Sequence, residues 1–375
     1  MKVGWETVPM GALCSIKSGK SDTKDAEEDG AYAFFDRSRT IKRSKRYLFD
    51  CEALIIPGEG TEFLPRHFVG KFDLHQRAYA LFEFSSRIDV KFVYYFLHHF
   101  ADYFPRVAVG ATVKSLRLRH FEELPVSTTT LPEQRRIVDI LDEAFDGIAT
   151  AEANAEKNLQ NARALFESHL QSVFTQRGKG WAQKTLAEVS SELGRGKSKH
   201  RPRNDPKLYG GKYPFIQTGD VRNASHVIET HSQSYNEAGL AQSKLWPAGT
   251  ICITIAANIA ETGILGFDAC FPDSVIGAVV DEDQTSTKFL AYLLQSFRTR
   301  LQALGKGSAQ ANINLGTFEN ERFPFPKAIE QERIVTKLDG LRAETQRLES
   351  IYQRKLAALD ALKKSLLHQA FTGQM

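Results

Sequence analysis

A six-residue segment occurs twice in this chain, as EQRRIV at residues 133–138 and as EQERIV at residues 330–335. The two copies lie 197 positions apart in a chain of 375 residues. Extended without gaps, residues 133–175 match residues 330–372 at 15 of 43 positions, and both segments end on Phe-Thr. Such a match with common ends indicates an internal duplication, so the chain is predicted to contain two similar halves.

Both copies are predicted to form a long helix. Neither contains proline, and their apolar residues recur three and four positions apart, as in a coiled-coil seam. Each helix would be about 60 Å long and would need another helix against its apolar stripe. Residues 133–175 carry eight acidic and four basic side chains, whereas residues 330–372 carry six acidic and eight basic ones. This opposite bias favours pairing of the two helices, although the same charges could simply be solvated.

The positions of the apolar residues predict the two seams. In the second copy the seam is expected at Ile334, Leu338, Leu341, Thr345, Leu348, Tyr352, Leu359, Leu362 and Leu366, with Lys355 as its main interruption. In the first copy it begins in one register and continues in a shifted one, at Ile137, Leu141, Ala144, Ile148, Ala151, Ala155, Leu159, Ala162, Phe166 and Val173. The EQxRIV segment itself could be only a favourable helix start, since Glu and Gln suit a first helical turn.

The segments that precede the two helices also resemble each other. SGKS at 18–21 aligns with RGKS at 195–198, and YAFFD at 32–36 aligns with YPFIQTGD at 213–220. Both segments are rich in short β-type runs, such as ALIIP and GTICITI, which turn residues separate. Each segment is therefore expected to fold around a β-sheet.

One further helix is expected in each copy, near residues 89–104 and 286–303. The predicted fold class is α+β, with two globular domains that are separated by two long antiparallel helices forming a coiled coil. The two halves should be related by an approximate two-fold repeat. The expected boundaries are 1–130 and 178–327 for the globular domains, and 131–177 and 328–375 for the helices.

Composition places few restrictions on the function. With 42% hydrophobic and 25% charged residues, the chain resembles an ordinary soluble protein. No apolar run approaches the roughly 18 residues that span a bilayer, and MKVGWETVPMG lacks the apolar core of a signal peptide. We therefore expect a cytoplasmic protein without a membrane partner. Cys14, Cys51, Cys252 and Cys270 show no metal-ligand spacing and are expected to be reduced thiols.

The motifs of several enzyme classes are absent from the sequence. RGKS at 195–198 resembles the end of a P-loop, but Ser191 stands where GxxxxGK[ST] requires its first glycine. No FxGxG-type cofactor loop, no NPPY- or DPPF-type tetrapeptide, no HExxH and no GxSxG is present. We therefore predict no catalytic, cofactor-binding or metal-binding residues in this chain.

Two loops are rich in Arg and Lys. RSRTIKRSKR at 37–46 and RGKSKHRPRNDPK at 195–207 each contain six such residues. Arg and Lys neutralise phosphates, and Arg can donate two hydrogen bonds to guanine, so the loops indicate nucleic-acid contact. A single run of this kind is more often only solvated, but its occurrence in both copies favours the functional interpretation. The formal net charge is only +4, so such a surface must be local.

Polar clusters near these loops could read base edges. Gln217 and the residues after it follow a predicted strand, and a Gln- and Asn-rich stretch follows Gly307. Amide side chains match adenine in the major groove. The complete set of predicted DNA-binding residues is Lys20, Arg37, Arg39, Lys42, Arg43, Arg66, Lys114, Arg117, Lys197, Lys199, Arg201, Arg203, Thr218, Arg222, Asn223, Gln310, Asn312 and Asn314.

The alternation of two variable domains with two similar long helices resembles the specificity subunit of type I restriction–modification enzymes. LPVSTTTLPEQRRIVDILD at 124–142 and FPFPKAIEQERIVTKLD at 323–339 are similar to the proline-led EQxxIV helix starts of that family. KKSLLHQAFTGQM at 363–375 is similar to its closing AFTG, from which the end of the first copy departs at Val173 and Gln176. The resemblance covers the whole chain.

This resemblance implies a function without catalysis in the chain itself. Each globular domain would be a target recognition domain for one half of a bipartite, asymmetric site in double-stranded DNA. The helices would set the distance between the halves and dock two modification (methyltransferase) subunits, which use S-adenosylmethionine to methylate adenine N6. Restriction subunits with ATP and Mg would add translocation and cleavage.

Two other interpretations remain open at this point. A self-sufficient nuclease–methyltransferase is disfavoured by the missing motifs. An orphan DNA-binding or scaffold protein on the same frame would be distinguished by its failure to associate with a modification subunit.

Overall fold

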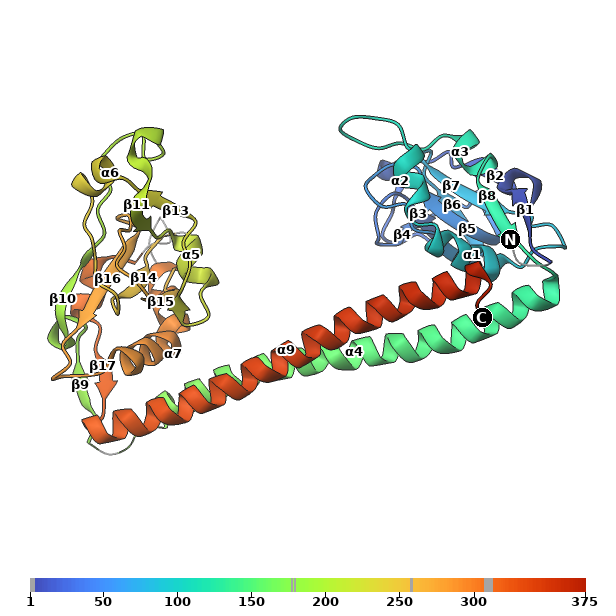
Figure 1. Cartoon of the computed structure of the whole chain (residues 1–375). Coiled ribbons are helices and arrows are strands. Elements are labelled where there is room, and N and C mark those ends of the chain that lie inside the picture. The colour runs from blue at the N-terminus through green and yellow to red at the C-terminus, as the bar shows by residue number, and fades with distance from the viewer. Residues whose placement is uncertain (1–3, 177, 179, 257–258, 307–312) are drawn as a thin grey trace. The chain divides into compact units, whose positions relative to one another are not determined.

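The computed structural model describes residues 4–176, 178, 180–256, 259–306 and 313–375. The chain forms two compact units, unit 1 with Met1–Lys157 and Tyr352–Met375, and unit 2 with Asn158–Ile351. Each unit contains one β-sheet domain and one half of each of two long helices (Figure 1). The helices are α4 (Leu131–Thr175) and α9 (Ala328–Thr372), each of 45 residues, and both predicted helices are thereby confirmed.

A six-stranded sheet forms the domain of unit 1. Its order is β2-β7-β5-β6-β3-β4, and β3 runs parallel to β6 whereas all other neighbours are antiparallel. Successive residues of a strand face opposite sides of the sheet, so the sheet contributes to two hydrophobic cores. In β5, Leu54 and Ile56 face helix α1 (Val90–His99), whereas Ala53 and Ile55 pack on the opposite face. The strands are β2 (Ser15–Ser18), β3 (Tyr32–Phe35), β4 (Lys42–Ser44), β5 (Phe49–Pro57), β6 (Arg66–Leu74) and β7 (Ala78–Phe82).

The five-stranded sheet of unit 2 repeats this arrangement. Its order is β10-β16-β14-β15-β12. The edge strand β12 is parallel to β15, as β3 is parallel to β6 in unit 1. The strands are β10 (Ser190–Arg195), β12 (Val227–Ile228), β14 (Ile251–Thr254), β15 (Thr262–Leu265) and β16 (Val275–Val280). The predicted α+β fold with a duplicated sheet domain is therefore confirmed.

The smaller elements correspond as well. In each unit a two-stranded sheet joins the start of the domain to the segment that enters the long helix. These pairs are β1 (Glu6–Pro9) with β8 (Pro125–Thr128), and β9 (Ala182–Lys184) with β17 (Phe323–Phe325). The corresponding helices are α1 (Val90–His99) and α7 (Thr287–Lys306), which were predicted, and α3 (Leu118–Glu122) and α8 (Leu315–Asn320). Further short helices are α2 (Tyr103–Val107), α5 (Thr218–Asn223), α6 (Glu237–Ala241), η1 (Met10–Ala12), η2 (Thr23–Asp25), η3 (Ala187–Val189) and η4 (Pro206–Leu208).

The alignment of YAFFD with YPFIQTGD holds only in part. YAFF forms β3 within the main sheet of unit 1. The corresponding β11 (Tyr209–Phe215) pairs instead with β13 (Gln233–Tyr235) in a separate two-stranded sheet, and Phe215 forms an isolated parallel bridge with Cys270, which lies between β15 and β16. The two units therefore differ most in the segment that follows these strands.

The two GKS segments occupy equivalent positions for a packing reason. A Cβ atom on Gly19 would lie 1.9 Å from the carbonyl oxygen of Leu74, and one on Gly196 would lie 2.2 Å from that of Phe271. No side chain fits where the backbone crosses so closely, so only glycine is tolerated there. The resemblance to a P-loop thus arises from sheet packing.

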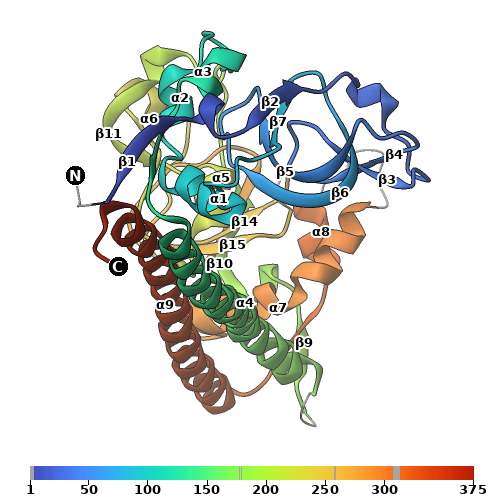
Figure 2. The ribbon, with the colours of Figure 1, turned by 90° about the vertical axis from the view of Figure 1, so that its right-hand side faces the viewer.

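Within each unit, the segments of α4 and α9 that belong to it pack against each other in antiparallel directions (Figures 1 and 2). In unit 1 Lys363 forms an ion pair of 2.6 Å with Glu152, and in unit 2 Arg163 forms one of 2.8 Å with Glu349. The stripe predicted for α4 is confirmed, because Ile137, Leu141, Ile148, Ala155, Ala162 and Phe166 are all buried. The Lys363–Glu152 pair follows the opposite charge bias of the two helices, whereas the Arg163–Glu349 pair runs against it.

The stripe predicted for α9 is wrong in its last part. Leu362 was expected in the seam but is 45% exposed. Lys363 is half-buried in its place, and Leu356 is half-buried beside the predicted interruption at Lys355. Leu359 and Leu366 are half-buried as predicted, so the error is confined to Leu362. Lys363 fits because its methylene stem can be buried while its ammonium group reaches Glu152.

The glutamine of each EQxRIV segment anchors a helix to its own domain. Gln134 is fully buried; its Oε1 accepts from the backbone N–H of Asp89, and its Nε2 donates to Thr128 Oγ1 at 3.0 Å and to the carbonyl oxygen of Thr129 at 2.7 Å. Gln331 accepts from Thr285 Oγ1 at 2.7 Å. The repeated segment is therefore more than a favourable helix start.

Candidate nucleic-acid interface

Most cations of the first basic loop are held by the protein itself. Lys42 pairs with the buried carboxylate of Asp36 at 2.6 Å, and Arg39 pairs with Glu62 on the surface. Arg43 donates to the carbonyl oxygens of Gly30 and Ala31, at 2.9 and 3.0 Å. Within the described residues, Arg37 is exposed and has no such partner. Of the basic residues predicted here to contact DNA, Arg37 is therefore the most available.

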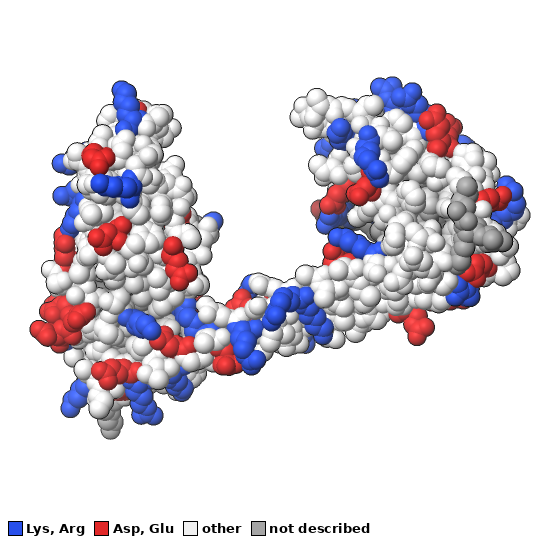
Figure 3. Space-filling view, in the orientation of Figure 1, with Lys and Arg blue, Asp and Glu red and all other residues white. Residues whose placement is uncertain are grey.

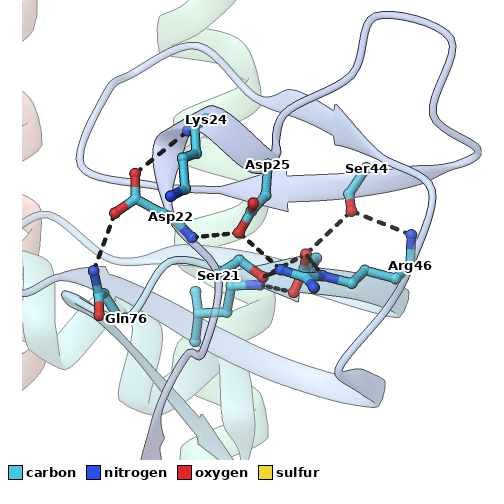
Figure 4. A network of polar contacts seen from close by, with 9 residues as sticks. Ser21, Asp22, Lys24, Asp25, Ser44, Arg46 and Gln76 are labelled. Carbon is cyan, nitrogen blue, oxygen red and sulfur yellow. Dashed lines mark hydrogen bonds and ion pairs between the residues drawn. The ribbon is translucent and has the colours of Figure 1, made fainter.

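Arg46 illustrates the structural use of this loop (Figure 4). Its guanidinium group donates to Ser21 at 2.9 Å and to Asp25 at 2.8 Å, and its Nε lies 3.3 Å from Asp73. Asp73 is 2% exposed and also accepts from the hydroxyl of Ser21 at 2.7 Å. Because a buried carboxylate needs such partners, Arg46 serves the fold of unit 1.

Four predicted cations gather around one hollow of unit 1. Arg37 and Arg39 follow β3, Arg66 begins β6, and Lys114 lies on the segment before α3; all four line the same depression. Apolar residues (Pro57, Leu64, Pro65 and Val113) and two glutamates (Glu59 and Glu62) complete its walls. Cations around a partly apolar hollow are suited to bind a DNA phosphate.

Arg66 is the most constrained of these cations. It donates to the carbonyl oxygen of Ser38, and its guanidinium carbon lies 5.8 Å from the ring centre of Phe35. Its Nη1 is buried and has no hydrogen-bond partner among the described residues. Burial lowers the pKa of Arg66, and the nearby carboxylate of Asp36 opposes that effect.

The second basic loop is likewise partly occupied. Arg203 forms a two-point salt bridge with Asp273, at 2.7 and 2.8 Å, and Arg195 donates to the backbone carbonyl oxygen of the same residue. Arg201 donates to the carbonyl oxygens of Ser198 and His200. Lys197 and Lys199 are exposed, and their ammonium groups make no hydrogen bond or ion pair with a described residue. These two lysines are the cations of this loop that are free to meet a phosphate.

Two adjoining hollows lie beside this loop in unit 2. One is lined by Gln217, Thr218 and Gln233, together with Arg203 and the aromatic residues Tyr209 and Phe215. The second is lined by Arg195, Arg203 and Asn314. Of the predicted residues, Arg203, Thr218 and Asn314 are thus brought together. Gln233 was missed, because no strand was predicted at β13 and nothing in the sequence connected it with Gln217.

The remaining predicted residues lie elsewhere. Lys20 and Arg117 are exposed and are not among the residues that line the hollow around Arg37, Arg39, Arg66 and Lys114. Arg222 and Asn223 are exposed at the end of α5. The carbonyl oxygen of the Asn314 side chain caps α8 by accepting from the N–H of Thr317 at 3.1 Å. Gln310 and Asn312 fall outside the described residues.

Charge is mixed over the surface in both units. Figure 3 shows Lys and Arg interspersed with Asp and Glu. Among the described residues, no group of three or more His, Cys, Asp and Glu side chains could hold a metal ion. The four cysteines are free thiols, and burial raises the pKa of Cys14 to about 12. No helix in the described part of the chain is both long and apolar enough to cross a membrane.

The fold and these surfaces define a duplicated protein with two sheet domains, two long helices and, in each sheet domain, a hollow that arginine side chains border. The type I restriction modification DNA specificity domain matches residues 2–160 and again residues 178–355. The chain therefore belongs to the family of type I restriction–modification specificity subunits, the non-catalytic components that provide DNA specificity in these complexes.

Individual relatives are distant, and one of them matches over the full length of this chain. The chain is 23% identical to the type I restriction enzyme EcoDI specificity subunit of Escherichia coli, over 100% of this chain and 89% of that protein. It is 21% identical to the putative MjaX specificity subunit of Methanocaldococcus jannaschii, over 78% and 69%.

Solved structures show the same fold. A chain from work on complex assembly and conformational transition of the type I R-M system has a TM-score of 0.73 at 18% identity, and covers 99% of this chain and 98% of that one. The HsdS subunit of Thermoanaerobacter tengcongensis has a TM-score of 0.55 at 17% identity, and covers 100% and 98%.

Proposed function

We propose that residues 1–130 and 178–327 are two target recognition domains, each of which reads one half of a bipartite, asymmetric site in double-stranded DNA. The observation that carries this proposal is the cationic hollow that each domain places beside its most divergent loops. Arg37 and Arg39 follow β3, and Gln217 and Thr218 follow the corresponding β11. A common frame with different polar side chains at matching positions suits two readers of different sequences.

We infer that Lys197, Lys199, Arg37 and Lys114 contact phosphates. Each is exposed, and none of the four side chains has a hydrogen bond or ion pair with a described residue. Arg66, with its buried and unpartnered Nη1, is placed to meet an acceptor that enters the hollow of unit 1. Phosphate contacts of this kind position a protein on DNA, and base-edge contacts then provide specificity.

Docking of two modification subunits is supported by identities between the two long helices at exposed positions. Most identities are explained by packing, for example Leu141 with Leu338. Five pairs are exposed in both copies, and three of them lie close together on each helix: Ala164 with Ala361, Leu165 with Leu362, and Ser168 with Ser365. Leu165 and Leu362 are 53% and 45% exposed. Two equal surface patches suit two identical partners.

The remaining components of the complex would supply the chemistry. In this proposal the modification subunits bind S-adenosylmethionine, and restriction/translocase subunits bind ATP and Mg. The complex would act in the cytoplasm. This chain contributes DNA recognition and the frame on which the subunits assemble.

The experiment that tests the function is co-expression of the chain with the modification subunit encoded beside it, followed by sequencing of N6-methyladenine in the DNA of the expression host. A single bipartite motif with two different half-sites is expected. Methylation that follows no motif, or a chain that does not associate with the modification subunit, would favour the orphan DNA-binding or scaffold alternative.

A further inference from the structure

Two glutamine side chains meet in the polar hollow of unit 2. Nε2 of Gln217 donates a hydrogen bond of 2.6 Å to Oε1 of Gln233. Gln217 is half-buried at the start of α5, and Gln233 is exposed on β13. Both line the hollow that Arg203 borders. The pair is therefore accessible from solvent and lies next to the basic loop.

The two backbone segments that carry these glutamines are held together by Asp220. Its carboxylate accepts from the backbone N–H of Gln217 at 2.8 Å and from the hydroxyl of Ser232 at 3.2 Å. Ser232 directly precedes Gln233, so one carboxylate fixes both ends of the pair. A side chain that is held in this way loses little further freedom on binding, which favours specific recognition.

The bond between the glutamines leaves hydrogen-bonding capacity unused. A primary amide nitrogen carries two hydrogens, so Gln217 retains one N–H and its carbonyl oxygen. The side chain of Gln217 also faces the backbone N–H of Asp220 as part of a capping box, which engages one of the two lone pairs of its carbonyl oxygen. Within the described residues, one amide hydrogen and the second lone pair of that oxygen are left for a ligand. A donor and an acceptor on one amide match the N7 acceptor and the N6 donor that adenine presents in the major groove.

We propose that Gln217 reads an adenine in the half-site contacted by residues 178–327, and that Gln233 is the positioning residue that orients its amide. This inference rests on the proposed function, since it assumes that unit 2 contacts DNA. The neighbouring lysines, Lys197 and Lys199, would hold the phosphates beside that base pair. Guanine presents two acceptors, N7 and O6, in the major groove. The N–H of Gln217 could donate to one of them, but its carbonyl oxygen would then face the other acceptor, so guanine should bind less well than adenine.

A competition experiment with the purified complex of this chain and its modification subunit tests the proposal. The bipartite motif is first obtained by methylation sequencing, and duplexes are then made in which each base pair of the unit 2 half-site is changed in turn. The wild-type complex should prefer adenine at one position by about 10- to 100-fold. Gln217→Ala should remove most of that preference at that position alone. Gln217→Glu should shift it toward cytosine, because a carboxylate accepts from cytosine N4.

The role of Gln233 has its own readout. Gln233→Ala should weaken the preference at the same base position, and in the double variant it should add little to the effect of Gln217→Ala, because it acts through that residue. Readout of the unit 1 half-site serves as an internal folding control in every variant. An unchanged preference in Gln217→Ala, or an equal loss at every position of both half-sites, would overturn the proposal. A wild-type complex without any bipartite motif would instead contradict the proposed function.

Discussion

The hydroxyl of Tyr292 donates a hydrogen bond of 2.7 Å to the carboxylate of Asp339, at the place where α7 lies against α9. The same contact occurs 197 residues earlier, where Tyr95 donates to Asp142 at 2.6 Å. In both units a lysine one turn before the tyrosine also pairs with the carboxylate, at 2.6 Å in each case. Each sheet domain is thus fastened to the long helix that follows it by the same polar contact, which the duplication has preserved.

This contact predicts a pH dependence of stability in unit 2. Burial and the hydrogen bond to Asp339 raise the pKa of Tyr292 to about 12. A group with a raised folded-state pKa stabilises the fold fully below its unfolded pKa of about 10, and this contribution is lost as the pH rises toward 12. Tyr292→Phe should therefore lower the free energy of unfolding by about 1–3 kcal/mol at neutral pH, and the difference from wild type should shrink above pH ~10. Urea denaturation at pH 7 and at pH 11 measures both values.

The carboxylate of Asp339 predicts how the stability of the same contact changes at low pH. Burial opposes ionisation of Asp339, but hydrogen bonds from Lys288 and Tyr292 prevail and hold its pKa below the ordinary value. The stabilisation is therefore present above the ordinary Asp pKa and is lost as the pH falls through the lowered one. Asp339→Asn should be less stable than wild type at pH 7 and should approach it below pH ~3. A constant difference across that range, in acid denaturation monitored by circular dichroism, would mean that the carboxylate charge is not what stabilises the contact.

Two exposed cations that line the hollow of unit 1, Arg37 and Lys114, predict a change in salt dependence. Arg37→Ala combined with Lys114→Ala should weaken DNA binding by the complex and reduce the slope of log K against log salt by about 2, since each phosphate contact contributes about 0.9. Lys45→Ala is a matched control from the same loop, because Lys45 already pairs with Glu27 and Asp29. Fluorescence anisotropy from 50 to 300 mM salt should show the altered slope in the double variant alone. Equal slopes in all three proteins would assign Arg37 and Lys114 to the solvated surface.

The exposed leucines of the long helices predict the stoichiometry of assembly. Leu165→Asp or Leu362→Asp should remove one modification subunit, and the double variant should remove both, because a charge would be buried in each docking patch. Native mass spectrometry counts the subunits directly. Leu141→Ala serves as a contrast, since this buried side chain should reduce stability without selecting one docking site. Full assembly of the double aspartate variant would place the docking surface elsewhere.

The burial of the EQxRIV glutamine predicts that substitution of Gln134 costs more stability than substitution of its neighbour Glu133. Gln134→Ala leaves several backbone and hydroxyl partners unsatisfied and should destabilise unit 1 by about 2–4 kcal/mol. Glu133→Ala removes a surface pair with Arg136 and should cost less than about 1 kcal/mol. Thermal denaturation of the two variants measures the contrast, and similar losses would show that Gln134 does not anchor the helix.

The sequence was sufficient to predict the duplicated architecture, because a gapless repeat and a 3-4 apolar spacing can be recognised without any knowledge of tertiary contacts. It was insufficient for the end of the α9 seam, where Leu362 and Lys363 both suit a helix and only packing against Glu152 selects the lysine. Neither the pairing of Arg46 with Asp73 nor that of Arg203 with Asp273 could be predicted, since each carboxylate is distant in sequence. For the same reason the partnership of Gln217 with Gln233 was missed.

The central claim is that two domains each read one half-site and that the long helices set the distance between the half-sites. The most direct test is to lengthen the helix pair and determine the methylated motif again. Four residues are inserted after Lys157 in α4 and four after Leu356 in α9, which lie near the same level of the antiparallel pair. Each helix then gains about 6 Å, or at most about two base pairs of B-DNA. The account predicts that both half-sites keep their sequences while the spacer between them grows by one or two base pairs. An unchanged spacer at full affinity, or altered half-site sequences, would contradict the claim that two independent readers are held apart by these helices.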